Sequence, residues 1–196
     1  MAMRFLFVGN SITTAPVNSA IGWDRTCGMA ASCAEKDYVH MAMERITRRF
    51  PESTFEILDA SEYEKNYNSF DLTEYEPYRD FEADVIVMRI IENVNPDDIA
   101  QNSFGRHYER IINYLNKRGA IIICTGSFWR NDDGDAIIKR ISVRNGYTFI
   151  PLSQLDTPEY RADGEFIDPG VAAHPSDEGM QEIAALIAEE VERRFS

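Results

Sequence analysis

The chain has 196 residues, of which 44% are hydrophobic and 27% are charged. This length and composition predict one globular domain over residues 1–196 and exclude a disordered or fibrous chain. Lys and Arg number 20 against 33 Asp and Glu, which gives a formal net charge of -13. A negative field of this kind repels polyanions and anionic lipid, so we expect neither a nucleic-acid partner nor a membrane partner.

The apolar run near the N-terminus, Phe5–Val8, is too short for the core of a signal peptide, and no stretch of the sequence is apolar for long enough to span a membrane. We therefore expect a cytoplasmic protein from the chain as given, and an exported one if a leader has been removed. The cysteines, Cys27, Cys33 and Cys124, form no C-x-x-C pair, and their odd number predicts no disulfide framework.

Short β-branched and aromatic runs alternate with segments of helical spacing, a pattern typical of a parallel sheet covered by helices on both faces. The predicted fold class is α/β, with three α/β/α layers built on a flavodoxin-like, doubly wound, five-stranded parallel sheet. The expected strands are Arg4–Val8, Thr54–Leu58, Asp84–Ile90, Ala120–Cys124 and Tyr147–Ile150.

Apolar residues at helical spacing predict helices between and after these strands. The expected helices are Ala34–Phe50, Phe104–Lys117, Asp132–Val143 and the segment that follows Ser176 as N-cap. The first of them is predicted to begin near Ser32, which forms a capping box with Glu35. The polar, Tyr-rich stretch Ser61–Arg79 lacks this spacing, so we expect an irregular crossover there.

A serine follows the first expected strand, at the end of the sheet where open α/β folds bind ligands. Ser11 lies in the segment Gly9–Thr13, whose glycine permits a sharp turn. A serine hydroxyl is a poor nucleophile unless a base takes its proton. His40 and His107 fall inside expected helices, whereas His174 lies in a loop before the last helix. We therefore expect Ser11 as nucleophile and His174 as general base.

The order of the short motifs in the chain resembles that of the SGNH (GDSL-like) hydrolase family. The motifs are Phe7–Thr13, Gly28–Ser32, Glu92–Val94 and His174–Met180. Each is weak alone, but their order and spacing over nearly the whole chain are fairly specific. The resemblance implies a three-layer α/β/α fold and the hydrolysis of acyl esters without a cofactor.

Carried over to this chain, the resemblance implies that Ser11 attacks the ester carbonyl. The backbone N–H groups of Ser11 and Gly28 and the side chain of Asn93 would form the oxyanion hole. Two positions depart from the family pattern, since Asn10 stands where Asp is frequent and Ile91 where Gly usually precedes the third motif's asparagine.

The acid of a catalytic triad is missing from its usual place, because Val171 stands three residues before His174. Without a carboxylate partner, the histidine can still act if a backbone carbonyl or another acid fixes its tautomer. We favour a dyad of Ser11 and His174, and after it Asp168 as the orienting acid. Two further acids, Asp177 and Glu92, are weaker candidates.

Aromatic residues follow the first and fourth expected strands, where they could surround the site. Trp23, Phe128 and Trp129 could stack on sugar rings there, and Glu92 is expected to face the pocket, so we predict substrate contacts for Trp23, Trp129 and Glu92. The expected partner is a small-molecule or carbohydrate ester, and the oligomeric state stays open. Burial in a lid or in the core is the competing interpretation of these aromatics.

Other interpretations of the sequence are weaker. Cys124, at the end of the fourth strand, could pair with His174 as a thiol nucleophile, although a buried cysteine is usually inert. The segment Asn131–Asp135 superficially resembles a calcium loop but fails in register, so no metal site is predicted. A carbohydrate-binding or scaffolding protein on a degenerate hydrolase fold is the non-enzymatic alternative, motivated by Val171 and Ile91.

Overall fold

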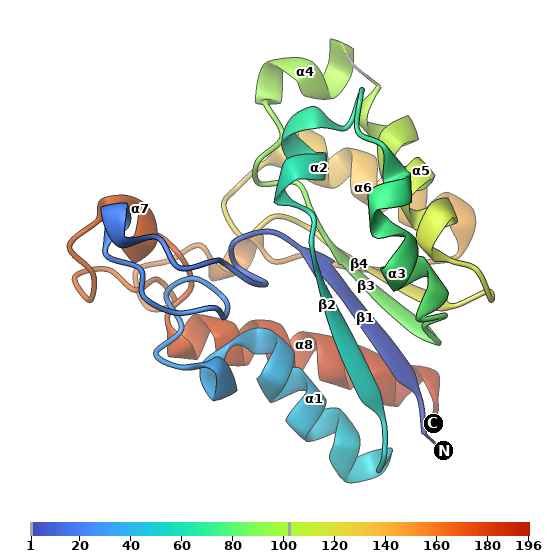
Figure 1. The fold of residues 1–196 in the computed structure, drawn as a ribbon, viewed down its shortest axis with the longest axis horizontal. Helices are drawn as coiled ribbons and strands as arrows, with labels where there is room; N and C mark the ends of the chain where they lie inside the picture. Colours follow the sequence, from blue (N-terminus) through green and yellow to red (C-terminus); the bar gives the residue numbers. More distant parts are fainter. Residues whose placement is uncertain (1, 102) are drawn as a thin grey trace.

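The computed structural model describes residues 2–101 and 103–196, and it is built on one parallel sheet (Figure 1). The five strands lie in the order β2-β1-β3-β4-β5, which is the doubly wound order that the sequence predicts. The strands are β1 (Arg4–Gly9), β2 (Thr54–Asp59), β3 (Val85–Arg89), β4 (Ile121–Thr125) and β5 (Thr148–Ile150). Every predicted strand is confirmed, with its ends correct to within one residue.

Side chains on the central strands alternate between two apolar cores, one on each face of the sheet. In β1, Phe5 and Phe7 face the helices α1 (Tyr38–Arg49) and α8 (Asp177–Arg194), whereas Leu6 and Val8 face the opposite layer. That opposite layer contains α2 (Ser61–Asn66), α3 (Glu76–Asp80), α4 (Pro96–Gln101), α5 (Phe104–Leu115) and α6 (Asp132–Asn145) (Figure 1). The result is the three-layer arrangement expected from strands buried on both sides.

The first predicted helix begins later than expected. A short 3-10 turn, η2 (Ala34–Lys36), precedes α1, and Asp37 is the N-cap, since its carboxylate accepts the His40 N–H at 2.9 Å. Ser32 does not cap this helix. Its N–H and hydroxyl donate instead to the carboxylate of Asp177, at 2.8 and 2.6 Å, and so join the loop to the start of α8. Local spacing alone could not predict this partner.

The prediction of an irregular crossover after β2 is wrong. The segment contains α2, the 3-10 turn η3 (Leu72–Tyr75) and α3, and each of the first two buries a tyrosine. These elements are four to six residues long, too short to show a helical period in the sequence. The later helices α5, α6 and α8 are confirmed, and Ser176 caps α8 by accepting the Gly179 N–H at 3.3 Å.

Long loops gather beyond the carboxyl ends of the strands and form a lobe on the left of Figure 1. They include residues 10–36, with the 3-10 turn η1 (Ser19–Ile21), and residues 151–176, with η4 (Ser153–Leu155) and α7 (Pro169–Ala172). The rings of Trp23 and Phe166 join the two loops, with their centroids 6.1 Å apart. In the described part of the chain, no helix combines the length and apolarity needed to cross a membrane.

Candidate active site

The structure brings Ser11 and His174 together at the mouth of the sheet. The Ser11 Oγ lies 2.9 Å from His174 Nε2, although 163 positions separate the two residues in the chain. Ser11 stands in a tight turn after β1, in which the N–H groups of Thr13 and Thr14 donate to the Asn10 carbonyl. Gly9 is needed before this turn, because a Cβ at that position would lie 1.8 Å from Thr13 Oγ1.

His174 follows α7, and a backbone carbonyl holds its ring on the side away from Ser11. Its Nδ1 lies 2.7 Å from the carbonyl oxygen of Gly170, which can only accept a hydrogen bond. The proton of the neutral ring therefore belongs on Nδ1, which leaves Nε2 as the acceptor that faces the Ser11 hydroxyl. Burial lowers the pKa of His174, against a smaller raising effect of the Gly170 carbonyl. The imidazole is thus kept neutral, as a general base must be.

The prediction that Asp168 orients the imidazole directly is wrong. The Asp168 carboxylate accepts the N–H groups of Gly170 and Val171, at 2.9 and 3.0 Å, and thereby caps α7. Its contribution to His174 is indirect, because this cap fixes the turn whose Gly170 carbonyl holds Nδ1. The weaker candidates have other partners too, since Asp177 binds Ser32 and Glu92 pairs with Arg89.

This geometry predicts different effects for two substitutions of Asp168. Asp168→Asn should keep any Ser11-dependent hydrolysis of p-nitrophenyl acetate within a few-fold of the wild type, because an asparagine caps a helix about as well. Asp168→Ala should lower kcat by about tenfold and the free energy of unfolding by about 1 kcal/mol, because the cap is lost. Steady-state kinetics and urea unfolding measure both effects. A loss near 10⁴-fold in Asp168→Asn would instead identify Asp168 as a triad acid.

A buried polar network lies directly under the Ser11 turn. Arg89, at the end of β3, is fully buried, and its guanidinium donates to Glu92 at 2.5 Å and to the Asn10 side-chain oxygen at 3.0 Å. Glu92 also accepts the Phe128 N–H at 3.0 Å and the Asn10 amide at 2.6 Å. The side chain of Glu92 is only 3% exposed. The expectation that Glu92 contacts substrate is therefore contradicted. Its buried carboxylate instead links the segments that follow β1 and β4 to the end of β3.

The network also accounts for an asparagine at position 10, where the pattern that the sequence resembles frequently has aspartate. The Asn10 Nδ2 group donates to Glu92 and to Glu64, the latter at 3.1 Å. An aspartate would place a further carboxylate against these two and would lose both donors. The carboxamide therefore suits a site that already contains two buried acids.

The three expected oxyanion donors have different surroundings in the structure. Among the described residues, the Ser11 N–H has no hydrogen-bond partner, so it can meet a ligand. The Gly28 N–H points to Asp37, whose Oδ2 lies 3.4 Å away, and so it is not free. The Asn93 Nδ2 group donates to Glu64 at 2.7 Å, which uses one of its two N–H bonds.

The Gly28 segment is nevertheless tied to the Ser11 turn. The Met29 N–H donates to the Ser11 carbonyl at 2.7 Å. The Ala31 N–H donates to the Gly28 carbonyl at 3.1 Å, which closes a turn. Within this turn, Ala30 has a φ of 73°, a left-handed conformation that costs an alanine free energy. Gly28 itself has no room for a Cβ, which would lie 2.5 Å from the Ile12 carbonyl oxygen.

Of the aromatic residues expected around the site, only Trp129 borders it. Its ring packs edge-on against His174 with the centroids 5.0 Å apart, and its Nε1 donates to the Ala173 carbonyl at 3.0 Å. Trp23 and Phe128 are fully buried in the core on the α1 side. The predicted substrate contact of Trp23 is therefore wrong, and the competing interpretation of a core residue holds for it.

Three residues near the site were not predicted from the sequence to belong to it: Asp37, Glu64 and Arg89. Arg89 carried a signal, since it is the one charged residue in an otherwise apolar strand. Glu64 carried none, because it lies in a segment interpreted as irregular. Asp37 was hidden inside the predicted first helix, of which it is the N-cap.

The rival sites are not supported. Cys124 is fully buried, in the core opposite to α1 and α8, and burial raises the pKa of its thiol, which makes it a poor nucleophile. In the segment interpreted as a failed calcium loop, Asn131 is the N-cap of α6 and accepts the Gly134 N–H at 3.0 Å. Among the side chains that the structure describes, no group of three His, Cys, Asp or Glu is placed to hold a metal ion.

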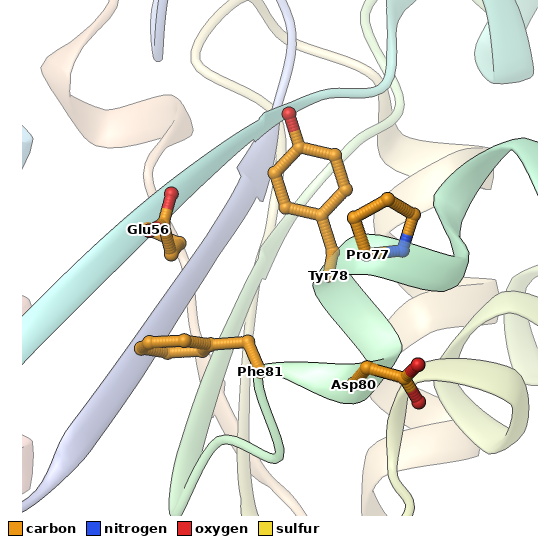
Figure 2. Close-up of a pocket in the computed structure, with 5 residues that line it drawn as sticks. All are labelled: Glu56, Pro77, Tyr78, Asp80 and Phe81. Atoms are coloured by element: carbon orange, nitrogen blue, oxygen red, sulfur yellow. The ribbon is translucent and has the colours of Figure 1, made fainter.

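A surface hollow of about 440 Å³ lies at the edge strand β2, and its lining includes neither Ser11 nor His174. Figure 2 shows the rings of Tyr78 and Phe81 extending from the α3 region toward β2, which carries Glu56. Asp80, also in its lining, is bound to Lys117 at 3.1 Å. None of the residues that line this hollow belongs to the Ser11 turn or to the His174 loop, so we do not assign it to the candidate active site.

No protein-family model matches the sequence, and no curated protein matches it. Solved structures, however, share its fold. A two-domain esterase active on acetylated mannans, co-crystallised with mannopentaose, matches with a TM-score of 0.63 and 18% identity over 98% of this chain. The match covers 49% of that esterase, so this chain spans about half its length.

Two further solved structures match over nearly their whole length. The acetyl xylan esterase AlAXEase has a TM-score of 0.60 and 19% identity, over 96% of this chain and 100% of its own. The psychrotrophic esterase EstA from Pseudoalteromonas sp., inhibited by monoethylphosphonate, has a TM-score of 0.60 and 10% identity, over 98% of both chains. The chain therefore has the α/β fold of SGNH/GDSL-type esterases, as its motif order predicts.

Proposed function

We propose that this protein is a serine hydrolase that cleaves short acyl esters, with Ser11 as nucleophile and His174 as general base. The observation that carries the proposal is the 2.9 Å hydrogen bond from the Ser11 hydroxyl to a ring whose opposite nitrogen is fixed by the Gly170 carbonyl. This arrangement provides the correct tautomer without a carboxylate.

The reaction follows from the two groups. As Ser11 Oγ bonds to the ester carbonyl carbon, His174 Nε2 takes the hydroxyl proton and then gives it to the departing alcohol oxygen as the ester bond breaks. Water then attacks the acyl-serine, His174 takes a water proton, and the acid leaves as Ser11 regains its hydrogen. The oxyanion would accept the Ser11 N–H and the second N–H of Asn93.

An acetylated carbohydrate is the substrate class that we favour. Trp129 lies edge-on to His174 and can offer an apolar surface beside the reacting ester. Neighbours with the same fold include an esterase described as active on acetylated mannans and an acetyl xylan esterase. The net charge of -13 disfavours acidic substrates.

The test compares acyl-chain lengths and sugar acetates. The purified chain should hydrolyse p-nitrophenyl acetate faster than p-nitrophenyl octanoate and should release acetate from acetylated xylo- or manno-oligosaccharides. Chromogenic assay and acetate quantification measure these rates. Preference for the octanoate would contradict the substrate class, while hydrolysis of either ester that depends on Ser11 would still support the hydrolase.

A carbohydrate-binding protein on this fold is the second candidate, and one observation favours it. The Gly28 N–H donates to the buried carboxylate of Asp37, so one of the three expected oxyanion donors is already engaged. Calorimetric binding of a neutral oligosaccharide with no turnover of any acetyl ester would establish this alternative and contradict the hydrolase.

A further inference from the structure

Glu64 is a buried acid that the proposed reaction does not use. It lies on α2 and is 1% exposed, and the charged groups that face it are Arg89, the last residue of β3, and Glu92, in the turn that follows. Its direct partners are two side-chain amides, Asn10 at 3.1 Å and Asn93 at 2.7 Å, one on each carboxylate oxygen. Burying a carboxylate without a cation in direct contact costs free energy, and groups of this kind are frequent at functional sites.

Both amides belong to residues of the expected site. Asn10 precedes Ser11 in the chain, and Asn93 is the residue implied as an oxyanion donor. Because one carboxylate binds both amides, the Asn93 nitrogen is fixed relative to the Ser11 turn. A side-chain amide nitrogen has two N–H bonds, and Glu64 takes one from Asn93. The part of the chain that the structure describes gives the second no partner, and Asn93 is exposed to solvent.

We propose that Glu64 is the positioning residue of the oxyanion hole: its carboxylate holds one N–H of Asn93 and thereby directs the other toward the oxyanion. This inference rests on the proposed acyl-transfer function and adds a residue to it. Glu64 touches no reacting atom and acts through Asn93.

The ionised carboxylate accepts one amide on each oxygen, whereas a proton makes one of these oxygens a donor and a weaker acceptor, so the role depends on pH. Burial and the nearby Glu92 raise the pKa of Glu64 to about 7, against the lowering effects of Asn93, Asn10 and Arg89. As the pH falls through this value, Glu64 takes a proton and its hydrogen bond with Asn93 weakens. His174 has a pKa lowered below its usual 6.5, so it gains its proton at lower pH. As the pH is lowered, kcat/KM should therefore fall first because Glu64 is protonated, and then more steeply because His174 is protonated.

The main experiment measures kcat, KM and the pH profile of Glu64→Gln with p-nitrophenyl acetate. Glutamine keeps the size of the side chain but sets an amide against one of the two asparagine amides. We expect kcat to fall roughly 10- to 100-fold with KM nearly unchanged, and the acidic limb to move to lower pH, because only His174 still titrates there. Glu62→Gln, on the same helix but 67% exposed, is the matched control and should change none of these.

Asn93→Ala separates positioning from a merely structural role. This variant should lose about 100- to 1,000-fold in kcat, and adding Glu64→Gln should cause a much smaller loss than Glu64→Gln causes alone, because Glu64 acts on the oxyanion hole through Asn93. Asn93 is exposed, so this variant keeps the test available even if Glu64→Gln fails to fold; its residual activity should show the His174 limb alone.

The outcomes separate the two proposals. If Ser11→Ala abolishes turnover but Glu64→Gln keeps the wild-type kcat and acidic limb, the positioning role is overturned and the hydrolase stands. Additive losses in Glu64→Gln and Asn93→Ala would also overturn it. If wild-type turnover does not depend on Ser11, the proposed function fails, and the positioning role fails with it.

Discussion

Ser11→Ala is expected to lower kcat/KM for p-nitrophenyl acetate by about 10⁴-fold or more, since no acyl-serine can form without the hydroxyl. His174→Gln should cost a similar factor, because the proton of Ser11 then has no acceptor. The two residues act as a unit, so the double variant should be hardly worse than either single one. Steady-state kinetics with burst-phase analysis measures these losses, and circular dichroism checks that each variant is folded.

The matched control for this result is Ser69→Ala, which removes an exposed hydroxyl far from the turn after β1 in the sequence. It should leave kcat/KM unchanged. Ser11→Ala with near-wild-type turnover would contradict the proposed nucleophile. An alkylating reagent that then abolished activity would direct attention back to Cys124, against the burial of that thiol.

Arg89→Ala is expected to have the largest effect on stability, a loss of about 3–5 kcal/mol in the free energy of unfolding. The substitution leaves Glu92 buried without its cation and also removes the donor to the Asn10 side chain. Urea unfolding at neutral pH measures the loss. Because the Asn10 turn carries Ser11, esterase activity should fall as well.

Two further variants test whether the buried ion pair is the cause. Adding Glu92→Gln to Arg89→Met should recover part of the lost stability, because no unpaired carboxylate then remains. Arg48→Ala breaks an exposed pair with Glu44, whose side chains are 73% and 66% exposed, and should change stability by less than about 1 kcal/mol. Equal losses in Arg89→Ala and Arg48→Ala would contradict the explanation.

The strands could be predicted from the sequence because their burial leaves a continuous pattern. β3 and β4 are apolar runs that strands covered on both faces require, and their limits agree with the structure to within one residue. The short helices α2 and α3 left no such pattern, since elements of five or six residues are stabilised by tertiary contacts rather than by periodicity.

The site was predictable in part for a related reason. Parallel strands all end at one edge of the sheet, so a serine after β1 and a histidine before α8 could be expected to meet there. The partners of those residues depend on side-chain directions that the sequence does not contain. Asp168 looked suitable as an orienting acid, yet its carboxylate turns back onto the N–H groups of Gly170 and Val171.

The 163-residue separation of Ser11 and His174 has a consequence for biosynthesis. The imidazole is translated 163 residues after the hydroxyl, and its loop leads into α8, which begins at Asp177 and packs beside α1. A ribosome-bound chain that has emerged only as far as β5 therefore contains the whole sheet but no base. On the proposed mechanism, ester cleavage should therefore begin only after His174 has also left the exit tunnel.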